Sequence, residues 1–142
     1  MNLKDWRDAG DFFRHGHNPI FFRSGKPAQE VTLLLHGFPT ASFDFHKIWD
    51  GLSNSFPLLA VDMIGYGFSA KPRDLDYTTF LQTDVIESLV RHAGASRVHI
   101  LAHDYGNTIT QELLARRAEG GLGFGIASIC FLNGAFRERA HR

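Results

Sequence analysis

The 142-residue sequence predicts an α/β protein with three layers, in which helices cover both faces of a mostly parallel sheet. Short apolar runs that end in a polar residue alternate with longer amphipathic segments, which is the spacing of βαβ units. Hydrophobic residues make up 44% of the chain and charged residues 21%, which is typical of a folded globular protein. We therefore expect a single domain over residues 1–142.

The elements follow one another in a regular order. Two Phe-rich segments, 10–14 and 20–23, flank a His-Gly-His-Asn-Pro stretch and predict an opening β-hairpin. Apolar runs predict buried parallel strands at 31–36, 58–62, 98–102 and 126–132. Helical patterns fall between these strands, at 45–52, 78–92 and 108–118. Residues 71–76 and 120–125 are expected to be loops.

Charge and composition exclude several classes of partner. The 15 basic and 15 acidic residues cancel, so no overall positive field attracts nucleic acid or an anionic membrane. No segment approaches the ~20 apolar residues of a membrane span, and acidic residues occupy the N-terminus where an export signal needs an apolar core. A soluble cytoplasmic protein is expected. The single cysteine, Cys130, lies in an apolar run and is expected to be a buried thiol.

Three turns that follow predicted strands carry unusual residues. In an open α/β sheet, functional residues gather at the carboxyl ends of the strands. The turns there read His-Gly-Phe-Pro-Thr at 36–40, Asp-Met-Ile-Gly-Tyr-Gly-Phe-Ser at 62–69, and Ala-His-Asp-Tyr-Gly at 102–106. In the second of them, Gly65 and Gly67 are expected to serve backbone geometry, and Ser69 to be a turn or cap residue.

The third turn has the form small-x-nucleophile-x-small, with Asp104 at the nucleophile position. A reactive side chain on a strained strand-to-helix turn crowds the residues two before and two after it, so Ala102 and Gly106 would leave the necessary room. The helix that follows would point its N-terminal amides at the carboxylate. Alternatively, Asp104 is only the N-cap of that helix.

The first turn favours the nucleophile over the cap. Its Phe38 would supply one amide of an oxyanion hole, beside the amide of Tyr105. Gly37 and Pro39 shape this turn, and His36 is expected to brace it rather than to act as a base. His103, next to the nucleophile, is a weak metal candidate because further ligands are missing.

No metal or cofactor is predicted. His99 and His103 stand four residues apart on a strand, about 13 Å at ~3.3 Å per residue, which is too far for one ion.

These three motifs, in this order, resemble the α/β-hydrolase family, and within it the branch of epoxide hydrolases and haloalkane dehalogenases. Residues 35–44, 103–106 and 111–114 are most similar to the mesoderm-specific transcript group and its bacterial relatives. The resemblance extends from about Phe22 to the C-terminus. It implies a three-layer α/β-hydrolase core with an N-terminal β-hairpin.

The resemblance also implies a two-step hydrolysis. Asp104 attacks a small apolar electrophilic substrate and forms an ester with the enzyme, which a histidine-activated water then hydrolyses. The oxyanion of the second step would lie between the amides of Phe38 and Tyr105. Tyr105 stands where dehalogenases typically have a halide-binding tryptophan. Phe38 is more typical of epoxide hydrolases, which use tyrosines of a cap domain, so the substrate stays open.

In that family the base histidine, its acidic partner and a helical cap follow the nucleophile. Here only His141 follows the helix after Asp104, and Asn133 stands where some relatives have the acid. The chain is therefore expected to be the N-terminal part of one hydrolase domain, without the cap and the C-terminal strands. A non-catalytic protein that kept the fold, either a pseudoenzyme or an interaction module, is the alternative.

Overall fold

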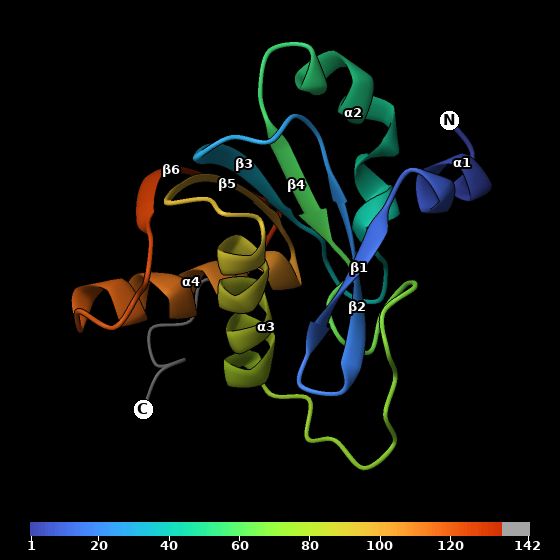
Figure 1. Ribbon diagram of the computed structural model, residues 1–142. Coiled ribbons are helices and arrows are strands. Elements are labelled where there is room, and N and C mark those ends of the chain that lie inside the picture. Colours follow the sequence, from blue (N-terminus) through green and yellow to red (C-terminus); the bar gives the residue numbers. More distant parts are fainter. Residues whose placement is uncertain (135–142) are drawn as a thin grey trace.

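The computed structural model describes residues 1–134 (Figure 1). Six strands form one sheet in the order β1-β2-β4-β3-β5-β6. The strands are β1 (Asp11–His15), β2 (Asn18–Ser24), β3 (Glu30–Leu35), β4 (Leu58–Val61), β5 (Arg97–His103) and β6 (Gly125–Leu132). The hairpin β1–β2 joins β4 in antiparallel fashion, and the other neighbours are parallel. The predicted hairpin and mostly parallel sheet are confirmed.

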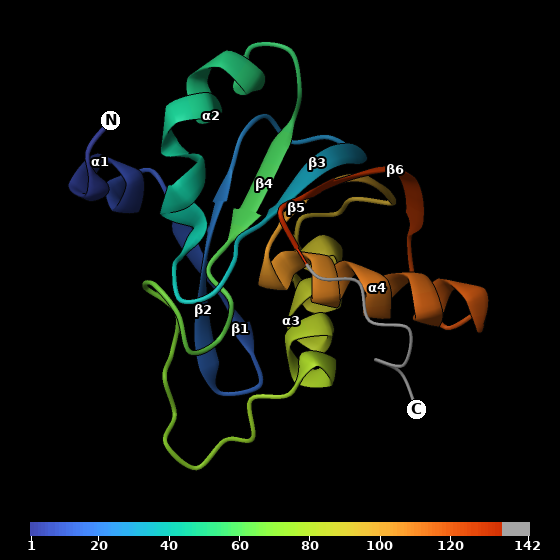
Figure 2. The same ribbon diagram turned by 180° about the vertical axis from the view of Figure 1, so that it is seen from behind.

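Helices cover both faces of this sheet, as predicted. Helices α1 (Leu3–Asp8) and α2 (His46–Ser53) lie on one side, and α3 (Thr79–His92) and α4 (Tyr105–Ala118) on the other (Figures 1 and 2). Successive side chains of a strand point to opposite faces. Accordingly Leu33 and Leu35 of β3 pack in the core with α3 and α4, whereas Leu34 packs with α1 and α2. Within residues 1–134, no helix has the length and apolar character that crossing a bilayer requires.

Helix α1 is an element that the hydrophobic pattern does not predict. It begins with a capping box, in which the Asn2 side chain accepts from the Asp5 amide and the Asp5 side chain accepts from the Asn2 amide. Trp6 is fully buried, and its indole N–H donates to Ser42 Oγ at 3.1 Å. The Arg23 guanidinium lies 4.4 Å above the Trp6 ring. One anchored aromatic side chain therefore holds this short helix on the sheet.

The other helices begin close to their predicted positions. A 3₁₀ turn, Ser42–Phe45, precedes α2, so helical structure starts a few residues before the predicted 45. Thr78 caps α3, so this helix begins one residue after the predicted 78. Helix α4 starts at Tyr105 instead of 108, because the Asp104 side chain accepts the Tyr105 amide proton and caps the helix there. The predicted loops are confirmed, apart from Gly125, which opens β6.

The expectation of a buried Cys130 is wrong, because Cys130 is exposed. Strand β6 lies last in the described sheet, and its residues alternate between two faces. Ile126 and Ile129 pack toward α3 and α4, whereas Ser128, Cys130 and Leu132 face the other side. On that side Leu101 of β5 packs with the cluster that contains Trp49 of α2, but no helix of residues 1–134 covers β6 (Figure 2). An apolar run alone does not reveal which part of a sheet face a helix covers.

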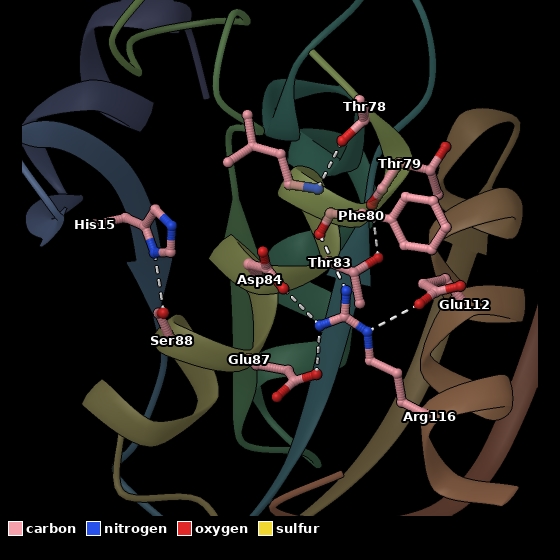
Figure 3. A network of polar contacts seen from close by, with 11 residues as sticks. His15, Thr78, Thr79, Phe80, Thr83, Asp84, Glu87, Ser88, Glu112 and Arg116 are labelled. Carbon is pink, nitrogen blue, oxygen red and sulfur yellow. Dashed lines mark hydrogen bonds and ion pairs between the residues drawn. The ribbon is translucent and has the colours of Figure 1, made fainter. Parts of the chain in front are cut away.

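Arg116 of α4 ties this helix to α3 (Figure 3). Its guanidinium lies 2.6 Å from Asp84, 2.8 Å from Glu87 and 2.9 Å from Glu112. Burial lowers the pKa of Arg116, but the hydrogen bonds to the carboxylates outweigh burial and raise it above its ordinary value. The guanidinium also donates to the Phe80 carbonyl at 3.2 Å. These contacts fix the direction of α4, whose N-terminus lies at Asp104.

Candidate active site

The ends of β3 and β5 meet at the Asp104 carboxylate. The backbone N–H of Phe38 donates to Asp104 Oδ1 at 2.8 Å, and the N–H of Tyr105 donates to the same oxygen at 2.7 Å. Two amides that converge on one oxygen are the arrangement of an oxyanion hole, whose donors work at about 3 Å. The structure thus brings together the three residues that the sequence singles out. Neither Oδ2 nor any histidine of residues 1–134 takes part in a further hydrogen bond at this carboxylate.

The backbone of Asp104 has φ 50° and ψ −112°. Among the non-glycine residues of the described chain, only Asn133 also has a positive φ. Such a conformation costs of order 1–3 kcal/mol and persists only where the surroundings over-determine it. Asp104 is therefore both the N-cap of α4 and the residue of a strained strand-to-helix turn, so the two sequence interpretations are compatible.

Small residues let the strand end and the helix start approach each other closely. A Cβ on Gly106 would lie 2.5 Å from the Leu35 carbonyl oxygen, and one on Gly37 would lie 2.6 Å from Asp104 Cβ. Ala102 is fully buried two residues before Asp104. A larger residue at Gly106 or Gly37 would push the two amide donors away from the carboxylate.

The surroundings keep the Asp104 carboxyl ionised. The amide of Phe38 lowers the pKa of Asp104 below its ordinary value, and partial burial opposes this effect. The amide of Tyr105 and the charge of His103 lower this pKa further. Within residues 1–134, no three metal-ligating side chains gather at His103 or elsewhere. The arrangement thus provides a carboxylate, rather than a carboxylic acid, at neutral pH.

His36 holds the turn that carries Phe38. It is fully buried, its Nε2 accepts the N–H of Met63 at 3.0 Å, and its Nδ1 lies 2.8 Å from the Gly37 carbonyl oxygen. Because Nε2 is an acceptor, the ring proton belongs on Nδ1, which donates to Gly37. The following peptide bond, Phe38–Pro39, is cis. Both ring nitrogens are occupied, so His36 supports the backbone and has no free nitrogen for water.

We expect His36 to make stability depend on pH. Burial lowers the pKa of His36 below its ordinary value, so below about pH 6.5 the unfolded chain takes up a proton that the native chain does not. Stability should therefore fall as pH falls, by at most about 1.4 kcal/mol per pH unit from this group. Urea unfolding at pH 7.5 and 5.5 measures the difference. The substitution His36→Gln should reduce this difference in the free energy of unfolding. If the difference is unchanged, the pH dependence comes from other groups.

The turn after β4 is built around the buried side chain of Asp62. Its Oδ1 accepts the amide proton of Ser42 at 2.8 Å, and its Oδ2 accepts that of Phe68 at 2.7 Å. Gly67 has φ 49°, and a Cβ there would lie 2.0 Å from Asp62 Oδ2. Gly65 also has a positive φ, as its expected backbone role requires. Ser69 is buried and its Oγ accepts the amide proton of Phe21 in β2 at 2.9 Å, so it links the turn to the sheet.

Tyr66, between these glycines, is a site residue that the sequence analysis did not single out. Its ring packs edge-on against His36 and Phe38, with centroids 5.5 Å and 6.3 Å apart. Burial raises the pKa of Tyr66, and the nearby Tyr105 and Asp104 raise it further. Phe38 leaves 67% of its surface exposed beside this ring. Together Tyr66 and Phe38 form an aromatic wall next to the carboxylate. The signal in the sequence was an aromatic residue between two glycines at a strand end.

Comparisons with known proteins agree with this architecture. Residues 31–120 match the family model described as alpha/beta hydrolase fold. The mesoderm-specific transcript homolog protein of Bos taurus is 42% identical over 99% of this chain and 44% of its own length. Epoxide hydrolase 3 of Xenopus tropicalis is 31% identical over 70% of this chain and 27% of its own length. The crystal structure of the haloalkane dehalogenase DatA from Agrobacterium tumefaciens has a TM-score of 0.75 and 25% identity, covering 90% of this chain and 42% of that one.

The chain thus spans less than half the length of these proteins. The resemblance to the mesoderm-specific transcript group and to the epoxide hydrolase and dehalogenase branch, stated above from three motifs, is confirmed. The family model covers the strands and turns that carry His36, Asp62 and Asp104. The chain therefore belongs to the α/β-hydrolase fold family.

Proposed function

We propose that this chain carries the nucleophilic half of a hydrolase that works through an ester on Asp104. The observation that carries the proposal is the strained Asp104 turn, with Oδ1 held by the Phe38 and Tyr105 amides. With Oδ1 fixed in this way, Oδ2 is the atom that attacks an electrophilic carbon. The bond from that carbon to its leaving group breaks as the bond to Oδ2 forms.

The same two amides serve the second step. In the ester, Oδ1 is the carbonyl oxygen, and it becomes the oxyanion when water attacks the Asp104 carbonyl carbon. The amides of Phe38 and Tyr105 already donate to this oxygen, so they stabilise the negative charge that develops on it. We place the base that activates the water, and the acid that orients the base, outside residues 1–134. His141, the one histidine after α4, also lies outside the described residues.

The substrate class follows from the nucleophile and its surroundings. A carboxylate forms a stable ester with a saturated carbon that bears a good leaving group, such as an epoxide or an alkyl halide. The aromatic wall of Tyr66 and Phe38 offers an apolar contact beside Asp104 and favours a small apolar substrate. One relative is an epoxide hydrolase and one similar structure is a haloalkane dehalogenase, which supports this class.

Intact mass spectrometry with peptide mapping tests the proposal. The exposed thiol of Cys130 also reacts with epoxides, so the chain should carry Cys130→Ala as background. After incubation with styrene oxide, we expect one added substrate mass on the peptide that contains Asp104. Because no histidine of residues 1–134 forms a hydrogen bond with this carboxylate, the ester should accumulate. An adduct on other residues alone, or no adduct at all, would contradict the proposal.

A further inference from the structure

A second set of chemically complementary side chains lies over β3, β5 and β6, on the same side of the sheet as α2. His99 of β5 stands between Ser128 of β6 and Glu30 of β3, with Nδ1 2.7 Å from Ser128 Oγ and Nε2 2.7 Å from Glu30 Oε1. His99 precedes Asp104 by five residues, about 16 Å along a strand at ~3.3 Å per residue. This serine–histidine–glutamate array is therefore separate from the Asp104 site.

An irregularity in the sheet creates the array. Val98 pairs with Ile126, but the next residue, His99, pairs with Ser128, so Ala127 is an extra residue in β6. In a regular register His99 would face Ala127, and Ser128 would point to the opposite side of the sheet. Bulges of this kind re-aim side chains and are frequent beside active sites. Here the bulge places a hydroxyl next to an imidazole.

The direction of the hydrogen bonds is set by Glu30. A carboxylate has no proton to donate, so His99 Nε2 carries the ring proton and donates it to Glu30. Nδ1 is then the acceptor, and the Ser128 hydroxyl donates to it. Arg97, on the same face, lies 3.5 Å from the second oxygen of Glu30. The three groups thus have the order nucleophile, base and orienting carboxylate.

An apolar groove adjoins the serine. Its volume is about 290 Å³, and besides Ser128 and His99 its lining includes Leu52, Phe56, Leu101 and Cys130. Ser128 is exposed at the groove, so its hydroxyl is accessible from solvent. Such a groove accepts the hydrocarbon part of a ligand whose polar end lies at Ser128.

We propose that Ser128 is an activated nucleophile that accepts acyl groups from apolar activated esters. Ser128 Oγ forms a bond to the acyl carbon, its proton passes to His99 Nδ1, and the bond to the leaving phenoxide breaks. Water attacks the acyl-serine in turn and releases the carboxylic acid. We assign no oxyanion hole to this array, so the leaving group must be a good one.

p-Nitrophenyl butyrate tests this inference in a background that carries Cys130→Ala and Asp104→Asn, which removes the neighbouring thiol and the other nucleophile. We expect release of p-nitrophenolate together with a butyryl group that maps to Ser128. Ser128→Ala should abolish the label and slow the release at least about a hundredfold, the lower end of the range for general acid–base catalysis. His99→Gln and Glu30→Gln should slow the labelling of an intact Ser128.

Ser96→Ala is the matched control, since Ser96 is also exposed but, within residues 1–134, its hydroxyl forms a hydrogen bond only with the Gln29 carbonyl oxygen, at 3.4 Å. It should leave the rate and the label unchanged. Circular dichroism of each variant shows whether the sheet is retained. A butyryl label on other residues, or equal rates with and without Ser128 in folded protein, would overturn the inference. Because the background lacks Asp104, either result is independent of the proposed Asp104 chemistry.

Discussion

In the Cys130→Ala background, an Asp104→Asn variant is expected to form the styrene oxide adduct at least about a thousandfold more slowly than the chain that keeps Asp104. The amide oxygen of asparagine is a far weaker nucleophile than a carboxylate, and the pKa of Asp104 is lowered so that the carboxylate prevails at neutral pH. Time courses of intact mass, with equal protein and epoxide concentrations, measure the two rates.

This substitution keeps the local structure, which makes the comparison informative. Asparagine retains an oxygen that can accept from the Phe38 and Tyr105 amides, and it tolerates a positive φ better than most residues. We expect the free energy of unfolding to decrease by about 1 kcal/mol, because the two hydrogen bonds then have a neutral instead of a charged acceptor. An adduct that forms equally fast in folded Asp104→Asn would assign the chemistry to another residue.

A Gly106→Ala variant is expected to lose about 2–3 kcal/mol of stability. By helix propensity alone, alanine in α4 would gain up to about 1 kcal/mol over glycine. Its Cβ, however, would lie 2.5 Å from the Leu35 carbonyl oxygen and 3.0 Å from that of His36. These are backbone atoms of the strand end and its turn, and they cannot rotate away. The steric cost should therefore exceed the propensity gain.

Gly51→Ala is the matched control for this prediction. Gly51 also lies inside a helix, α2, but a Cβ there would have no heavy atom within 4 Å. It should stabilise the chain by about 0.5–1 kcal/mol. Urea unfolding of both variants gives the two values. Similar, stabilising effects of the two substitutions would show that α4 and the end of β3 have room to separate.

Most of the fold was predictable because its central strands consist almost entirely of apolar residues. The run 31–36 and the strand Glu30–Leu35 nearly coincide, since Leu33, Leu34 and Leu35 are all buried between two layers. Helix α1 was not predictable in this way, because it is only six residues long and buries Trp6 alone. The periodic pattern of apolar residues that predicts a helix can be recognised only where several positions of the helix are buried. The capping pair Asn2 and Asp5 was the available signal.

The candidate site was predictable to the extent that it follows strand ends. Phe38, Asp104 and Tyr105 directly follow β3 and β5, which are neighbours in the sheet, so their proximity needs only the strand order. The array at Ser128 was not predictable, because it depends on a register shift at Ala127 that leaves no mark in the amino-acid pattern. Whether a strand contains an extra residue is decided by packing against its neighbour.

The sheet order also determines when a reactive Asp104 appears during refolding. Strand β3 lies between β4 and β5 in the sheet. Its pairing with β5 brings Glu30 next to Arg97, although α2, β4 and α3 lie between these two residues in the chain. Contacts between residues so distant in the chain are slow to form, because the entropy of closing the intervening loop is lost first. Local helices form on a far shorter time scale. Pulses of epoxide during refolding would thus time the arrival of β5 beside β3.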